Sequence, residues 1–198
     1  KEEDLRINND VLLRDKLKDS DFVFFLAFDV GGSRYLEKYQ HTFSFINNNI
    51  SIMRNVFSEL NNTKKKFVFA SSQMSEMGFS PYGVCKAIGE KYTLSLNGAI
   101  ARFWNVYGPE KDLEKSHVIT DFVNMAKNDK HIKMLTDGSE RRQFLYVDDC
   151  CECLYLLSKK YDTIDKTREY HVTSFQWNSI RQIADIISKN FNNIPVDG

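Results

Sequence analysis

The sequence predicts an α/β fold built around a parallel sheet, and three observations support this class. Continuous apolar runs of strand length, such as Phe22–Ala27, are typical of strands that are buried on both faces. Segments with helical periodicity alternate with these runs. Polar or glycine residues follow three of the runs, at Phe28–Gly32, Ser71–Ser72 and Asn105. Ligands of parallel sheets bind beyond the carboxyl ends of the strands, so these three segments predict one ligand-binding crevice.

The first half of the chain contains two expected strands and two expected helices. The run Phe22–Ala27 follows a polar, charged stretch, and the run Lys66–Ala70 ends at a pair of serines. Between them, Asn49–Leu60 has apolar residues at helical intervals. Pro81 suits the first turn of a helix, where its missing N–H has no partner to lose, so a helix is expected over Pro81–Leu96.

The second half continues the alternation with shorter strands. Apolar residues recur at helical spacing in two segments, and the second of these is clearly amphipathic. One short strand leads directly into a helix that ends near Ser158. In chain order, the expected elements are a strand at Gly98–Phe103, a helix at His117–Lys127, a strand at Phe144–Val147 with its following helix, a strand at Glu169–Val172 and a helix at Ser179–Ser188.

The composition excludes several classes of protein. The 198 residues are enough for one domain, or for one large and one small domain. Basic and acidic residues balance at 27 each, so no nucleic-acid partner is expected. No apolar run approaches the roughly 20 residues of a membrane span. Cys150, Cys151 and Cys153 lack zinc-ligand spacing, so with Cys85 they are interpreted as reduced packing cysteines of a cytoplasmic protein without a metal site.

Tyr82 and Lys86 are the first candidates for chemistry. Four residues apart on a helix, they lie one turn from each other and face the same way. An ammonium beside a phenol stabilises the phenolate, so we expect Lys86 to lower the pKa of Tyr82 and prepare it to act as a general base.

The spacing alone is weak evidence, because two other pairs have it. One spans a proline and the other lies late in an apolar helix; these are Tyr107/Lys111 and Tyr155/Lys159. Only Tyr82 follows a strand that ends in a serine, Ser72. A hydroxyl, a phenol and an ammonium can then surround one substrate alcohol, and a cofactor would supply the hydride acceptor. Trp104 and His171 are interpreted as structural.

Seven motifs together resemble the extended short-chain dehydrogenase/reductases, and within them the NAD-dependent nucleotide-sugar epimerases and dehydratases. The resemblance runs from about Asp4 to Ile187. The most specific match is Arg102–Pro109, which is close to Arg-x-x-Asn-Val-Tyr-Gly-Pro. The other segments that carry it are Asp4–Arg6, Phe25–Phe28, Asn49–Ile50, Phe67–Ser72, Tyr82–Lys86 and Thr136–Asp149.

The resemblance implies a Rossmann-like, doubly wound parallel sheet with NAD or NADP as cofactor. The implied catalytic residues are Ser72, Tyr82 and Lys86. The implied cofactor-binding residues are Asp4, Leu5, Leu26, Ala27, Phe28, Asn49, Ala70, Ser71, Tyr82 and Lys86. The implied residues for a nucleotide-sugar substrate are Gly31, Gly32, Ser72, Asn105, His117 and Arg142. For His117, a polar residue near a helix start is the favoured account. A homodimer through helices 49–62 and 81–96 is also implied.

The chain departs from this family at its beginning. The glycine fingerprint that should open the fold is absent, and Asp4 lies too near residue 1 for the βαβ unit of about 30 residues that carries it. We therefore expect a fragment of a longer protein that lacks the N-terminal βαβ unit. Residues 1–108, joined by 143–173, are expected to form the dinucleotide-binding domain. A small, partly formed substrate-binding domain is expected from 109–142 and 174–198.

The residues after Ser72 favour one reaction of the family. Dehydratases of this group carry an Asp-Glu pair there, whereas this chain has Gln73 and Met74, which do not transfer protons. Asp29–Gly32 resembles the GDP-mannose 3,5-epimerases, but Met74 stands where those enzymes have a cysteine. A 4-epimerase acting through a transient 4-keto sugar needs only Ser72, Tyr82, Lys86 and the cofactor. A reductase or dehydratase of the same family, a non-catalytic NAD- or sugar-nucleotide-binding relative and a dimeric scaffold remain as alternatives.

Overall fold

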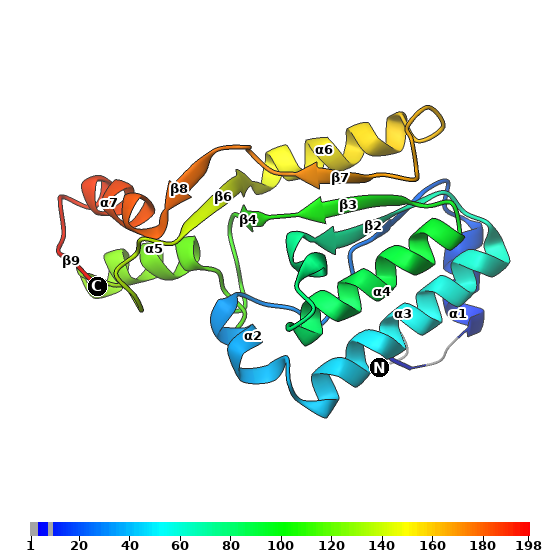
Figure 1. The fold of residues 1–198 in the computed structure, drawn as a ribbon, viewed down its shortest axis with the longest axis horizontal. Helices are drawn as coiled ribbons and strands as arrows, with labels where there is room; N and C mark the ends of the chain where they lie inside the picture. The colour runs from blue at the N-terminus through cyan, green and yellow to red at the C-terminus, as the bar shows by residue number, and fades with distance from the viewer. Residues whose placement is uncertain (1–3, 8–9) are drawn as a thin grey trace.

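A four-stranded parallel sheet forms the centre of the fold (Figure 1). The computed structural model describes residues 4–7 and 10–198. The strand order is β1 (Val23–Phe25), β2 (Phe67–Ser72), β3 (Ala99–Phe103) and β7 (Glu169–Val172). The predicted α/β class with a parallel, Rossmann-like sheet is confirmed.

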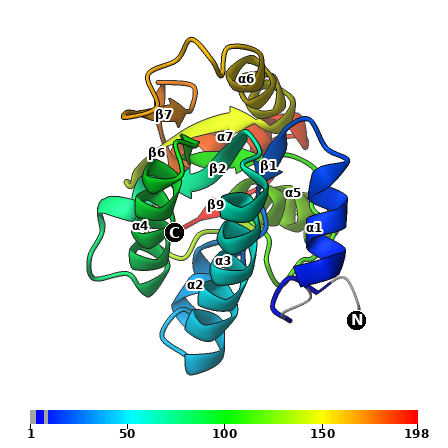
Figure 2. The same cartoon turned by 90° about the vertical axis from the view of Figure 1, so that its right-hand side faces the viewer.

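Helices cover both faces of this sheet, as a doubly wound fold requires (Figure 2). On one face, α3 (Phe43–Thr63) and α4 (Pro81–Ser95) pack against side chains such as Phe67 and Phe69. On the other face, α6 (Val147–Lys159) packs against Val68 and its neighbours. The outermost helix, α1 (Asp10–Lys18), lies against α3.

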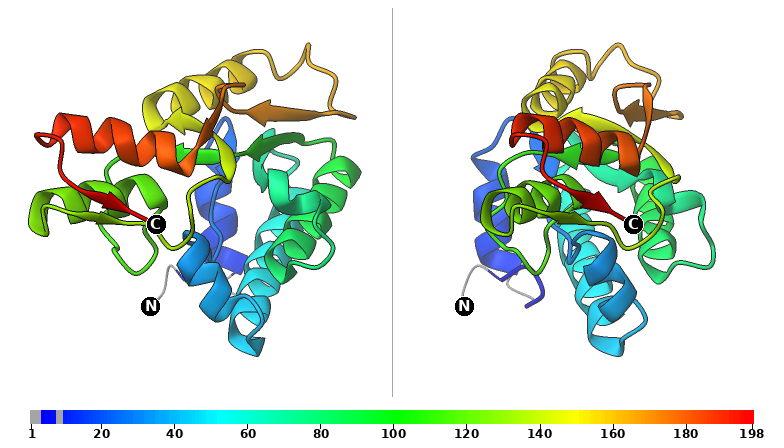
Figure 3. Two further views of the ribbon diagram at one scale, coloured as in Figure 1. Left: turned by 60° about the vertical axis from the view of Figure 1, so that its left-hand side comes forward. Right: turned by 90° about the vertical axis from the view of Figure 1, so that its left-hand side faces the viewer.

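The second part of the molecule lies beyond the carboxyl ends of β3 and β7 (Figure 3). It contains a small sheet in the order β4 (Asn105–Tyr107), β6 (Arg141–Tyr146) and β8 (Trp177–Ser179). A two-stranded sheet pairs β5 (Ile132–Lys133) with β9 (Val196–Asp197). The helices α5 (Val118–Asn128) and α7 (Ile180–Asn190) pack together around a separate apolar core.

Several elements differ from the sequence expectation. The helices α1 and α2 (Ser33–Tyr39) are additional, because short polar segments give little periodic signal. The helix α3 starts earlier than expected, since the Thr42 side chain accepts a hydrogen bond from the Phe45 N–H and so caps the helix. The apolar run at Phe22–Ala27 is paired only over the three residues of β1.

The four cysteines are all free. Cys85 and Cys150 are buried, as expected of packing residues, but Cys151 is exposed, so the packing interpretation is wrong for it. Within the described ranges, no helix is both long and apolar enough to cross a membrane.

Candidate active site

The three predicted catalytic residues come from two neighbouring elements. Ser72 ends β2, and its Oγ accepts a hydrogen bond from the Met74 N–H at 3.1 Å, which starts the short 3₁₀ helix η1 (Gln73–Glu76). The Ser80 hydroxyl caps α4 by accepting from the Gly83 N–H at 3.2 Å. Tyr82 therefore lies in the first turn of α4, and Lys86 lies one turn later.

Ser72, Tyr82 and Lys86 converge, as the sequence predicts. The side chains of Ser72 and Tyr82 line the same cavity. The Lys86 Nζ lies 5.7 Å from the centre of the Tyr82 ring and donates to the Ala70 carbonyl at 2.6 Å. It also lies 3.6 Å from the centre of the Phe28 ring. Tyr82 and Lys86 are only 8% and 3% exposed, so bulk water does not solvate either charge.

Burial is the largest influence on the pKa values of Tyr82 and Lys86. It raises the pKa of Tyr82 to about 12, although the neighbouring Ser72 hydroxyl acts in the opposite direction. It lowers the pKa of Lys86 to about 7. The expected lowering of the Tyr82 pKa by the ammonium is therefore absent, because both groups lose water and desolvation disfavours both charges.

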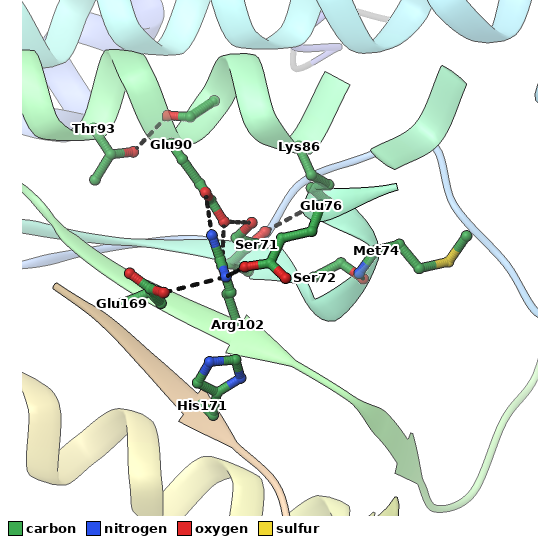
Figure 4. A network of polar contacts seen from close by, with 12 residues as sticks. Ser71, Ser72, Met74, Glu76, Lys86, Glu90, Thr93, Arg102, Glu169 and His171 are labelled. Carbon is green, nitrogen blue, oxygen red and sulfur yellow. Dashed lines mark hydrogen bonds and ion pairs between the residues drawn. The ribbon is translucent and has the colours of Figure 1, made fainter. Parts of the chain in front are cut away.

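Behind Ser72, an ion-pair network centred on Arg102 joins four elements (Figure 4). The Arg102 guanidinium of β3 donates to both carboxylate oxygens of Glu90 on α4, at 2.8 and 2.9 Å. Its third nitrogen contacts Glu76 of η1 at 2.6 Å and Glu169 of β7 at 3.3 Å. Burial acts to raise the pKa of Glu90, but hydrogen bonds from Arg102 and Ser71 hold it below its ordinary value.

This network accounts for Ser71, which the resemblance assigns to the cofactor. Its hydroxyl donates to Glu90 at 2.6 Å, and both residues are buried. Sequence reasoning missed Glu90 and Arg102 as a pair. No local spacing indicates this pair, because Glu90 lies on α4 and Arg102 on β3.

Asn49 is likewise engaged inside the protein. Its Oδ1 accepts from the Asp29 N–H at 2.7 Å, and its Nδ2 donates to the carbonyls of Asp29 and Phe45 at 3.0 and 3.1 Å. The side chain is fully buried, and these hydrogen bonds fix the loop after β1 against α3.

The remaining expected cofactor residues lie along the start of the chain and the end of β1. Asp4 forms an exposed ion pair with Arg6 at 2.6 Å, and the Leu5 carbonyl accepts from Asn55 at 2.9 Å. Leu26 is exposed, and Ala27 and Phe28 are partly buried next to the core under α3.

Lys86 is the group whose chemistry fits a nicotinamide cofactor. An ammonium has three donors, and in the described part of the chain its hydrogen-bond acceptor is the Ala70 carbonyl. The remaining donors face aromatic rings, at the end of the sheet where parallel folds bind their ligands. Two hydroxyl oxygens of a bound cofactor could accept hydrogen bonds from these remaining donors.

A cavity of about 700 Å³ joins the catalytic residues to the predicted substrate residues. Ser72 and Tyr82 line it together with five of the residues that the resemblance assigns to the substrate. These are Gly31, Gly32, Asn105, His117 and Arg142. Trp104, Arg141 and Trp177 also line this cavity.

A second cavity, of about 290 Å³, lies beside α5. Apolar side chains such as Phe122 and Met125 line much of it, and Asn105, His117 and Arg142 line both cavities. These three side chains therefore stand where the two cavities meet.

The two glycines of the loop after β1 serve contacts within the protein. A Cβ on Gly32 would lie 2.1 Å from the Ser116 carbonyl oxygen, and one on Gly31 would lie 2.8 Å from the Tyr35 side chain. The Gly32 N–H donates to the Lys115 carbonyl at 2.9 Å. Both glycines line the large cavity, but close packing between segments already requires them.

His117 and Arg142 differ in how firmly they are held. The ring of His117 contacts Glu110 through Nδ1 at 2.6 Å, and its backbone N–H donates to the same carboxylate at 2.9 Å. His117 also precedes α5 directly, in agreement with the favoured account of a polar residue at a helix start. Arg142 is exposed and contacts the Arg141 carbonyl at 2.9 Å.

No group of three or more metal-ligating side chains could hold a metal ion within residues 4–7 and 10–198.

The chain is similar in sequence and in fold to proteins of one family. The sequence model described as "NAD dependent epimerase/dehydratase family" matches residues 3–173. A UDP-N-acetyl-alpha-D-glucosaminuronate decarboxylase of Bacillus cytotoxicus is 29% identical over 165 residues, which are 71% of this chain and 50% of that protein. A putative UDP-glucose 4-epimerase of Methanocaldococcus jannaschii is 32% identical over 117 residues, which are 54% of this chain and 36% of that protein.

Among solved structures, the UDP-N-acetylglucosamine 4-epimerase of Methanobrevibacter ruminantium, in complex with UDP-N-acetylmuramic acid, aligns with a TM-score of 0.82. It is 25% identical, and the alignment covers 98% of this chain and 67% of that one. The chain spans half or less of the length of the two curated relatives.

Proposed function

Because the chain belongs to the NAD dependent epimerase/dehydratase family, we propose that the protein is an NAD-dependent nucleotide-sugar 4-epimerase. The observation that supports this most is the convergence of Ser72 and Tyr82 on the large cavity, with the Lys86 Nζ 5.7 Å from the centre of the Tyr82 ring. The residues that line the cavity opposite them offer a place for the sugar.

In this proposal, Tyr82 moves the proton of the C4 hydroxyl. Tyr82 is neutral at neutral pH and must first ionise, and a charged Lys86 beside it lowers the energy of the phenolate. Ser72 donates a hydrogen bond to the same sugar oxygen and orients it. The cofactor supplies a hydride acceptor that no side chain provides.

Loss of the hydroxyl proton and of hydride from C4 leaves a 4-keto sugar. When the sugar turns and presents its other face, the hydride returns to C4 and Tyr82 gives its proton back to the oxygen. The configuration at C4 is then inverted, and protons and electrons balance over the cycle.

The junction of the two cavities suits the diphosphate of the substrate. Arg142 is exposed there, and in the described part of the chain its guanidinium forms no ion pair. A guanidinium can hold a phosphate through two parallel hydrogen bonds. Asn105 donates to the Gln143 carbonyl at 3.3 Å, a long contact that a phosphate oxygen could replace. The smaller, more apolar cavity beside α5 would take the nucleoside.

The side chains of η1 argue against elimination of water. Gln73 and Met74 line the large cavity, and neither transfers protons. The nearest acid in η1, Glu76, is bound to Arg102 at 2.6 Å. Proton transfer in the cavity is therefore assigned to Tyr82.

We also propose that two copies of the chain pair through α3 and α4. Both helices expose apolar side chains away from the sheet, Ile46 and Ile50 on α3 and Val84 and Ile88 on α4. Apolar patches of this kind mark interaction sites more often than ordinary surface.

The test is product analysis with the protein at its natural full length. NAD and a panel of UDP-sugars (UDP-glucose, UDP-N-acetylglucosamine and UDP-glucuronic acid) are supplied, and proton NMR follows the configuration at C4. Inversion at C4 without change in mass is expected for one of them. If no panel member is inverted while NAD and the sugar nucleotide both bind, the epimerase assignment is wrong.

Decarboxylation is a second candidate, favoured by the decarboxylase relative that matches 71% of this chain. It would begin with the same oxidation at C4, in which Tyr82 takes the hydroxyl proton and the cofactor would accept the hydride. Release of carbon dioxide from UDP-glucuronic acid, with loss of mass from the sugar, would support it over epimerisation.

A further inference from the structure

Both tryptophans of the chain lie on one wall of the cavity that contains Ser72 and Tyr82. Trp104 follows β3, and Trp177 begins β8. Their ring centres are 5.5 Å apart and their planes cross at 82°, an edge-to-face arrangement. Trp177 is 49% exposed, although burying an indole is strongly favourable.

This pair of indoles, the tryptophan wall, is held in place at its edges. The Trp104 Nε1 donates to the Nδ1 of His171 on β7 at 3.0 Å. The Trp177 backbone pairs with Gln143 across the antiparallel β6–β8 ladder, and its carbonyl accepts from Arg141 at 3.2 Å. The indoles are therefore positioned by the backbone and by polar contacts, while the Trp177 ring remains open to the cavity.

The other sides of the cavity have a different character. Ser72, Asn105 and Arg142 offer hydrogen bonds, so the cavity combines one aromatic wall with polar groups that converge on it. Small-molecule sites commonly combine apolar walls with a few placed polar groups. A pyranose matches this pattern, because its hydroxyls project around the ring while its C–H groups form apolar patches on the faces. The electron-rich face of an indole attracts such partly positive C–H groups.

We propose that Trp177, backed by Trp104, stacks on the C–H face of the substrate's pyranose and determines which sugars the site accepts. The inference rests on the proposed function, since it places the sugar of a nucleotide sugar in the large cavity. The nucleoside does not compete for this wall, because neither tryptophan lines the smaller cavity beside α5. Sugars with an uninterrupted C–H patch on the face toward Trp177 are favoured, and those with an axial hydroxyl in that patch are disfavoured.

The test compares UDP with UDP-sugars in the full-length protein, by calorimetric titration of the wild type and of two Trp177 variants. Trp177→Leu keeps an apolar side chain but has no π face, and Trp177→Phe restores one. Trp177→Leu is expected to weaken the best-binding UDP-sugar of the panel about tenfold and to leave the affinity for UDP unchanged. Trp177→Phe is expected to recover most of the loss.

Phe175→Leu is the matched control, because Phe175 is an exposed aromatic residue of the same segment that does not line the cavity. It should bind both ligands as the wild type does. Equal affinity of Trp177→Leu and wild type for every UDP-sugar overturns the stacking role alone. Equal weakening of UDP and UDP-sugar overturns it as well, because the effect is then not on the sugar. If the wild type binds no nucleotide sugar, the proposed function fails together with this inference.

Discussion

Tyr82 and Lys86 are titratable side chains that lie in one buried site, and burial disfavours the charged form of each. Burial keeps the phenol neutral, with its pKa at about 12, and brings the ammonium close to neutrality, with its pKa at about 7. A ligand that hydrogen-bonds the ammonium would favour its charged form, and that charge in turn would favour the phenolate. Binding and activation of the base are thereby coupled in this site.

Removal of the phenol oxygen tests the role of Tyr82. Tyr82→Phe keeps the ring that packs against Phe28, so folding and ligand binding should persist. Turnover is expected to fall at least about 10²-fold, the usual scale of acid–base catalysis. Steady-state kinetics with the active UDP-sugar measures this, and circular dichroism checks the fold. Unchanged turnover would end the assignment of Tyr82 as the base.

Lys86 gives a pH dependence of stability whose sign follows from its lowered pKa. Between the folded pKa of about 7 and the ordinary lysine pKa of 10.5, the unfolded chain binds more protons, so the free energy of unfolding rises with pH. From pH 7 to pH 9, the wild type should gain about 2 kcal/mol relative to Lys86→Met, which does not titrate. Urea unfolding of both proteins at the two pH values measures the difference. Parallel pH profiles would contradict the prediction.

At the scale of residues, the sequence predicts the candidate catalytic side chains better than the buried residues that hold them in place. Ser72, Tyr82 and Lys86 are recognisable because their spacing and their place after a strand are local properties. The pairing of Glu90 with Arg102 and the burial of Asn49 depend on partners that are distant in sequence or on another element. No local pattern indicates such partners.

At the scale of elements, the Arg102 network holds β3, α4, η1 and β7 together. Glu90→Gln would leave a buried guanidinium without its main counter-charge, which costs about 3 kcal/mol in comparable pairs. Glu76→Gln is the matched control, since the Glu76 side chain is 72% exposed and water can replace it. Urea denaturation should show a large loss for the first variant and a small one for the second. Similar losses would contradict the buried network.

The loop after β1 and the segment before α5 touch through Gly32. A methyl group in Gly32→Ala would overlap the Ser116 carbonyl, and such overpacking costs about 2 kcal/mol. Gly78→Ala provides the control, because a Cβ there meets nothing within 4 Å. Thermal unfolding of both variants checks the prediction, and a Gly32→Ala protein as stable as Gly78→Ala would show that the contact is not required.

For the whole molecule, the proposed dimer can be tested through the outer face of α4. Ile88→Glu places a charge on the exposed apolar face and is expected to shift the protein from dimer to monomer. Ile186→Glu on α7 is the control, because Ile186 is similarly exposed but lies away from α3 and α4. Light scattering coupled to size exclusion measures the mass. A wild type that is already monomeric would contradict the proposal.

Most of the long helices and buried strands were predictable from the sequence, whereas the shortest strands and their pairing were not. Long buried runs and periodic helices predict β2, β3, α3 and α4, because burial on one or both faces determines their composition. The strands β5 and β9 have two residues each and carry no periodic signal. The antiparallel pairing of β6 with β8 is also non-local, so the wall that bears Trp177 was not foreseen.

The chain passes three times between the large sheet and the second part of the molecule, from β3 to β4, from β6 to α6 and from β7 to β8 (Figure 1). Trp104 belongs to the first link and Trp177 directly follows the third, and both side chains line the large cavity. Any change in the angle between the two parts would therefore change the shape of this cavity.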